Sequence, residues 1–102
     1  MKTIKNDTLK NIINSIDQFS EEMVLFVRKE WGINSDSYVY DFEDDEEVPM
    51  KINDEYYFLE VAAVNDVIDV WNSWTSGNQA SIEQVVAAVI HYAVNDAYKS
   101  AE

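Results

Sequence analysis

Residues 38–60, YVYDFEDDEEVPMKINDEYYFLE, contain two aromatic segments separated by an acidic one. In the first segment, residues 38–42, aromatic side chains occupy every second position, which predicts a β-strand with one aromatic face. That face would consist of Tyr38, Tyr40 and Phe42. Residues 43–55 have the acidic composition and the single proline of a loop, and residues 56–60 again have strand composition.

A third strand is predicted earlier in the chain. Residues 23–27, MVLFV, form a short apolar run that is rich in β-forming residues. The competing interpretation is a helix capped by Ser20, because periodicity alone does not separate the two for so short a run. Short loops between the three strand segments favour an antiparallel meander.

Helical periodicity predicts three further elements, one before the strands and two after them. Residues 4–18 place isoleucine and leucine near a 3.6-residue period, which is typical of an amphipathic helix. A second helix is predicted over residues 61–74 and a third over residues 82–98. Before the third helix, Ser81 and Gln84 have the spacing of a capping box.

The resulting order, α-β-β-β-α-α, predicts an α+β fold in which a small antiparallel three-stranded sheet packs against an N-terminal helix and two C-terminal helices. A chain of 102 residues has room for one core, so we expect a single acidic domain over residues 1–102. Apolar residues make up 47% of the chain and aromatic residues 13%, which indicates a globular rather than a disordered protein.

The charge of the chain is unbalanced and concentrated. The formal net charge is −13, and residues 36–69 hold twelve acidic residues against one lysine. Such a chain lacks the basic surface needed to bind nucleic acid or anionic membranes directly. It has no cysteine, no bilayer-spanning apolar run and no secretory signal, so we expect a location in the cytoplasm of a bacterium or a phage-infected cell.

Few residues carry recognisable catalytic chemistry. His91 is the single histidine, and we interpret it as a helix-face side chain bonded to a neighbour rather than as a general base. The acidic run invites a calcium site, but residues 33–76 contain no glycine for the sharp turn of an EF-hand loop. Gly32 and Gly77 are too few and too far apart for a phosphate-binding loop. The sequence predicts a protein that is not an enzyme and needs no cofactor or metal.

The acidic run is the predicted functional element. Its simplest interpretation is a solvated loop that keeps the protein soluble. Its six acids in residues 41–47 repel one another, however, and aromatic strands hold the run on a scaffold. We therefore interpret it as a surface for a basic protein, such as a nuclease or a nucleic-acid-binding effector. The predicted contact residues are Asp41, Glu43, Asp44, Asp45, Glu46 and Glu47, with Asp54 and Glu55 secondary and Tyr40 and Trp74 as aromatic anchors.

Three motifs carry a resemblance to known families. They are EDDEEVP at residues 43–49, the pattern Leu59-x-x-x-x-Val64-x-Asp66-Val67-Ile68, and the ending HYAVNDAY at residues 91–98. Together they resemble a family of small, acidic, uncharacterised bacterial proteins. More loosely, the size, acidity and layout of the chain resemble the immunity proteins that neutralise nuclease toxins, which implies inhibition of a basic nuclease. Phage-encoded nucleic-acid mimics, including anti-CRISPR and antirestriction proteins, share these features and are the alternative.

A different class of function depends on the last helix. Its apolar residues cover most of its girth, so it is either central to the core or paired with a second chain. The protein would then be a structural or regulatory interaction module, or a homodimer. In that case, charge removal at residues 43–47 would leave binding intact, whereas aspartate at Ile90 or Val94 would abolish it.

Overall fold

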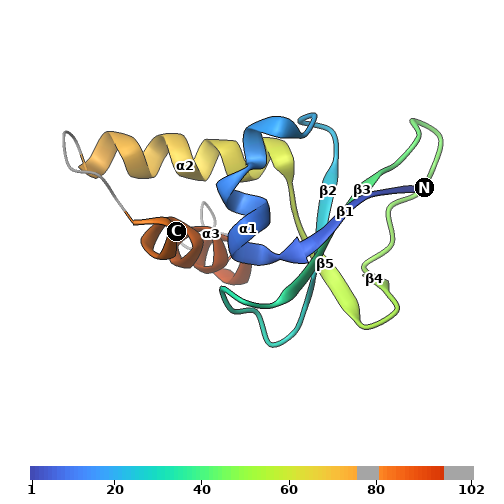
Figure 1. The fold of residues 1–102 in the computed structure, drawn as a ribbon. Helices are drawn as coiled ribbons and strands as arrows, with labels where there is room; N and C mark the ends of the chain where they lie inside the picture. The colour runs from blue at the N-terminus through green and yellow to red at the C-terminus, as the bar shows by residue number, and fades with distance from the viewer. Residues whose placement is uncertain (76–80, 96–102) are drawn as a thin grey trace.

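Strand β2 (Val24–Arg28) lies at the centre of a five-stranded antiparallel sheet in the computed structural model, which describes residues 1–75 and 81–95. The strands lie in the order β1-β3-β2-β5-β4, and the sheet curls into a half-barrel with the helices on one side (Figure 1). In chain order, the remaining elements are β1 (Lys2–Thr8), α1 (Leu9–Asn14), the 3-10 helix η1 (Ile16–Gln18), β3 (Asp36–Asp41), β4 (Lys51–Ile52), β5 (Glu55–Glu60), α2 (Val61–Thr75) and α3 (Ile82–Asn95).

The three predicted strands are confirmed, but their predicted order is wrong. Both β3 and β5 pair with β2, so β2 lies between them, whereas a meander would place β3 in the middle. The apolar run of β2 explains this position, because residues 24–27 are buried on both faces of the sheet. Only a central strand with neighbours on either edge and packing on either face buries such a run completely.

The predicted N-terminal helix over residues 4–18 is also wrong in its first part. Residues 2–8 form β1, which pairs with β3, and helix begins only at Leu9. The Thr8 hydroxyl accepts a hydrogen bond from the Asn11 backbone N–H at 3.2 Å and so acts as the N-cap. The apolar periodicity was therefore real only from Leu9 onward.

The segment predicted as one loop, residues 43–55, contains the short strand β4. Lys51 pairs with Tyr56 and Ile52 with Glu55 in a tight hairpin. Asn53 sits in the hairpin turn with a φ of 53°, in the left-handed region that asparagine tolerates better than most residues. With β1 and β4, the sheet has five strands rather than three.

The main core lies between one sheet face and the helices. Its buried side chains come from α1, η1, β2, β3, β5, α2 and α3; they include Leu9, Ile12, Leu25, Val27, Val39, Phe58, Val64, Val86 and Val89. The predicted capping box is confirmed, because the Ser81 N–H donates to Gln84 Oε1 at 3.0 Å and the Gln84 N–H donates to the Ser81 hydroxyl at 3.2 Å. Within the described residues, no helix is both long and apolar enough to cross a membrane.

Candidate functional site

The second face of the sheet carries a separate aromatic cluster. Its residues come from strands and from the position after β3, with no contribution from a helix. We call it the aromatic face; it consists of Val24, Phe26, Tyr38, Tyr40, Phe42, Ile52 and Tyr57. The prediction that Tyr38, Tyr40 and Phe42 share one face is confirmed. Figure 1 shows the reason for its separateness, since all three α-helices lie on the other side of the sheet.

Strand pairing places three rings in one row across the aromatic face. Phe26 is opposite Tyr38 on β3 and opposite Tyr57 on β5. The Phe26 ring is fully buried and meets the rings of Tyr40 and Tyr57 edge-on, with centroids 5.5 and 5.8 Å apart. Tyr38 stacks on Tyr40 with centroids 5.7 Å apart. Tyr38, Phe42 and Tyr57 remain half-exposed, so the face has a buried centre and accessible outer rings.

The acidic loop, residues 43–47, follows the aromatic face directly, because Phe42 is the residue before it. It leaves the sheet at the end farthest from α2 and α3 (Figure 1). The carboxylates of four of its residues are exposed and form no ion pair within residues 1–75 and 81–95. These four are Glu43, Asp44, Asp45 and Glu47. They carry concentrated negative charge on a surface that no helix covers.

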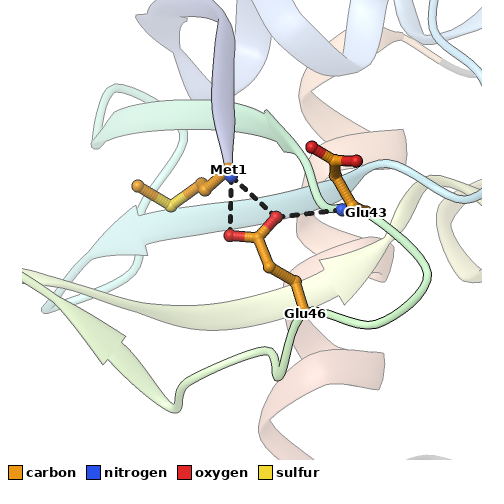
Figure 2. Close-up of polar contacts among 3 residues, drawn as sticks. All are labelled: Met1, Glu43 and Glu46. Carbon is orange, nitrogen blue, oxygen red and sulfur yellow. Dashed lines mark hydrogen bonds and ion pairs between the residues drawn. The ribbon is translucent and has the colours of Figure 1, made fainter.

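The fifth acid of the loop, Glu46, holds it in place. Both Glu46 carboxylate oxygens accept from the Met1 ammonium group at 2.6 Å, and Oε1 also accepts the Glu43 backbone N–H at 2.9 Å (Figure 2). The Glu46 N–H donates back to the Glu43 carbonyl at 2.9 Å. The Glu43 N–H, and then the ammonium group, lower the pKa of Glu46. Glu46 is thus a structural clamp that ties the loop to the start of β1.

Other predicted contact residues occupy different environments. Asp41 is half-buried at the end of β3, opposite Lys2. Asp54 is exposed in the hairpin turn, with a carboxylate oxygen 3.8 Å from the Arg28 guanidinium. The side chain of Trp74 lies outside the described residues.

Tyr40 and Glu55 do not lie on the surface where contact was predicted. Tyr40 is 4% exposed, and the Glu55 side chain is 5% exposed with an oxygen 3.8 Å from Arg28. The cause is strand pairing and ring packing. Tyr40 lies on β3, between β1 and β2, with its ring against Phe26 and Phe42, and Glu55 is enclosed between β2 and β4. In this conformation a partner does not reach either side chain.

Two carboxylates of β5 also act on the tyrosines of the aromatic face. Burial, followed by the charge of Glu55 and the neighbouring Tyr38, raises the pKa of Tyr40. Burial, followed by the charge of Glu60, raises the pKa of Tyr57. Glu60 is exposed and lies opposite Val24 in the register, so its side chain borders the face. The face is therefore in a negative field from both β5 and the acidic loop.

The contact residues predicted from the sequence did not include Glu60, Tyr57 and Arg28, which the structure places on this surface. The period of two does not extend along the whole of β5, because the register of β2 and β5 shifts between Leu25 and Phe26. Because of that irregularity, the Glu60 side chain lies on the same face of the sheet as Tyr57. The bulge has no residue signature in the sequence, so only the pairing shows it.

The single histidine occupies an ordinary surface position. His91 is exposed on α3, and its Nδ1 lies 3.1 Å from the Asn95 side-chain amide nitrogen. The described ranges contain no group of three or more His, Asp or Glu side chains placed to hold a metal ion.

Comparison with known proteins gives a family but no activity. No curated protein and no solved structure is significantly similar to the chain. A family model described as a domain of unknown function (DUF7716) matches residues 5–100. This match covers nearly the whole chain, including every motif that carried the resemblance to a small uncharacterised family. The chain belongs to the DUF7716 family.

Proposed function

We propose that this protein is a non-enzymatic inhibitor that binds the basic nucleic-acid-binding or active surface of another protein and occludes it. The observation that carries the proposal is that the acids of the acidic loop have two different environments. Glu46 ties the loop to the start of β1, while Glu43, Asp44, Asp45 and Glu47 are exposed without ion-pair partners in the described chain. Four like charges on a fixed loop oppose compactness and serve no evident structural purpose.

A fixed negative field is suited to capturing a basic protein surface. It steers the encounter and raises association rates roughly ten- to a thousandfold at low salt, an effect that falls as salt screens the charges. The strongest basic surfaces among proteins are those that bind phosphates of DNA or RNA. Occupation of such a surface excludes the nucleic acid.

The most specific form of the proposal is an immunity protein that neutralises a nuclease toxin. A phage-encoded anti-CRISPR or antirestriction protein would act by the same occlusion on a defence nuclease. The two forms differ in the partner and in the neighbouring genes, not in the binding surface. Both predict that the captured protein loses nuclease activity when the chain is bound.

The test compares two variants with the same change in net charge. The loop variant carries Glu43→Gln, Asp44→Asn, Asp45→Asn and Glu47→Gln, and keeps the Glu46 clamp. The control variant carries four equivalent changes at exposed acids elsewhere. These are Glu21→Gln, Glu22→Gln, Asp66→Asn and Asp69→Asn.

Each form of the protein is used to capture proteins from host lysate at low and moderate salt, with identification by mass. Captured nucleases are then assayed with and without added chain. We expect the wild type and the control variant to retain a basic nuclease in a salt-sensitive manner and to inhibit it, and the loop variant to lose both. Equal capture by the loop variant would refute the mechanism.

The alternative based on the last helix is favoured by one observation. Val94 is 63% exposed on α3, whereas Ile90 packs against the core. Val94→Asp is therefore the clean probe of that surface, because aspartate at Ile90 would disturb folding as well. Loss of the partner in Val94→Asp, with retention in the loop variant, would select the interaction module over the acidic inhibitor.

A further inference from the structure

We infer that the aromatic face is an arginine-binding surface, which takes guanidinium groups from a basic segment of the partner protein. This inference rests on the proposed function and names the chemical group that the partner supplies. The acidic loop attracts any cation, but a row of accessible rings discriminates among cations. The two parts of the site would therefore do different things.

The outer rings of the aromatic face are accessible to a partner. Tyr38, Phe42 and Tyr57 are half-exposed on a sheet face without helices, around a fully buried Phe26. Accessible aromatic rings around a rigid buried centre are typical of the residues that dominate binding energy at protein interfaces. Because Phe26 and Tyr40 fix the rings from below, binding requires little ordering of side chains.

Negative charge lies beside these rings. Glu60 lies close enough to Tyr57 to raise its pKa, and the acidic loop begins at the residue after Phe42. Two nearby cations of the described residues are already paired: the Arg28 guanidinium lies against Asp54 and Glu55, and the Met1 ammonium group binds Glu46. A cation over the rings would therefore meet negative charge on two sides. This complementarity excludes an acidic or phosphate-bearing occupant.

The half-exposed ring of Tyr56, the neighbour of Tyr57 on β5, offers a comparison. Tyr56 projects toward the opposite face, and the chain's own Lys29 and Lys51 cover it, with Nζ atoms 4.8 and 5.1 Å from its centroid. Within residues 1–75 and 81–95, no lysine or arginine covers Tyr38 or Tyr57 in this way. The fold thus covers the half-exposed Tyr56 ring with its own lysines and leaves the rings of Tyr38 and Tyr57 open to a cation from outside.

Arginine fits this surface better than lysine. Its guanidinium is planar, stacks on aromatic faces and is more weakly hydrated than an ammonium group. It also presents several N–H donors at once, so a stacked guanidinium can bond neighbouring carboxylates such as Glu60. A lysine side chain would be attracted by the acidic loop, but the rings would add little to its binding affinity.

The test uses octa-arginine and octa-lysine peptides, which have the same length and charge, titrated into the full chain and followed by fluorescence anisotropy. The tyrosine variant carries Tyr38→Thr and Tyr57→Thr, and the matched control is Tyr56→Thr. We expect wild type and control to bind octa-arginine about five- to tenfold more tightly than octa-lysine. The tyrosine variant should bind both peptides about equally, with octa-lysine affinity unchanged.

The loop variant separates the two proposals. Its affinity for both peptides should fall by the same factor, so that the preference for octa-arginine remains. If the tyrosine variant keeps the preference, or if Tyr56→Thr removes it, the arginine inference is wrong while the acidic inhibitor stands. If the loop variant binds octa-lysine as tightly as wild type does, the proposed function fails instead.

Two further measurements guard against loss of folding and against self-association. In the wild type, the ring proton resonances of Tyr38 and Tyr57 should shift when octa-arginine is added, and shifts confined to the acidic loop would overturn the inference. A variant with Tyr38→Phe and Tyr57→Phe keeps the rings and should keep the preference. Sedimentation should show a wild-type monomer, since a dimer that the tyrosine variant dissociates would assign this face to a second copy instead.

Discussion

The ion pairs of Arg28 provide a direct test of how burial sets the value of a charge in this fold. Its guanidinium lies 3.8 Å from a carboxylate oxygen of both Asp54 and Glu55, so distance does not separate the two pairs. Burial does, because the Asp54 side chain is 77% exposed and that of Glu55 only 5%. At about 4 Å, two unit charges attract by about 1 kcal/mol in water and about 4 kcal/mol at an effective dielectric constant near 20.

We expect the coupling free energy of Arg28 with Glu55 to be about 1.5–2 kcal/mol, below the upper value because Arg28 is itself 52% exposed. Its coupling with Asp54 should be below about 0.5 kcal/mol, as for other exposed pairs. Two double-mutant cycles measure these values by urea unfolding, with Arg28→Met combined with Glu55→Gln in one and with Asp54→Asn in the other. Equal coupling in the two cycles, or additive effects of Arg28→Met and Glu55→Gln, would refute the argument from burial.

The remaining predictions concern the clamp, the cap and the centre of the aromatic face. Because the pKa of Glu46 is lowered on folding, its stabilising effect is complete above the ordinary value of 4.5 and is lost as pH falls through the folded value. Thermal melts across this range should therefore show a smaller loss of stability on acidification for Glu46→Gln than for wild type, whereas Glu47→Gln should behave as wild type does. Ser81→Ala removes the N-cap of α3 and should lower the free energy of unfolding by about 1 kcal/mol, seen as a Tm lower by about 4–8 °C. Phe26→Ala should cost about 3–5 kcal/mol by urea unfolding, and a cost below about 1 kcal/mol would mean that the ring cluster is not a packed core.

Sequence pattern predicted those elements whose signal is local. The alternation of residues 38–42 and the compact apolar run of residues 23–27 gave correct strands, and Ser81 with Gln84 gave a correct helix start. Sequence pattern gave the wrong prediction where the conformation of a segment depends on pairing with a strand far away in the chain. Residues 2–8 are extended because they pair with the edge of β3. Nothing in the sequence of the segment itself indicates that this edge is available.

In the candidate site, too, local features were predictable from the sequence and features that depend on distant pairing were not. Composition located the acidic loop, because charge concentration is visible in one dimension. Composition did not show that Glu46 is neutralised by Met1, nor that Glu55 is enclosed beside Arg28, because both facts depend on the pairing of strands far apart in the chain. The identity of Glu60 as a border of the aromatic face depends on a single register shift in β5.

The two faces of the sheet explain how the protein combines a stable fold with an unusually acidic composition. The helix-covered face holds the main core and carries most of the buried apolar side chains. Folding does not require the other face to end in half-exposed rings, nor the following loop to keep four carboxylates without cationic partners in the described chain. Each feature opposes stability, by exposing apolar area or by repulsion between like charges. The acidic loop begins directly after Phe42 of the aromatic face. The proposed surface for a basic, arginine-bearing partner uses both features, whereas a loop that served solubility alone would not need the rings beside it.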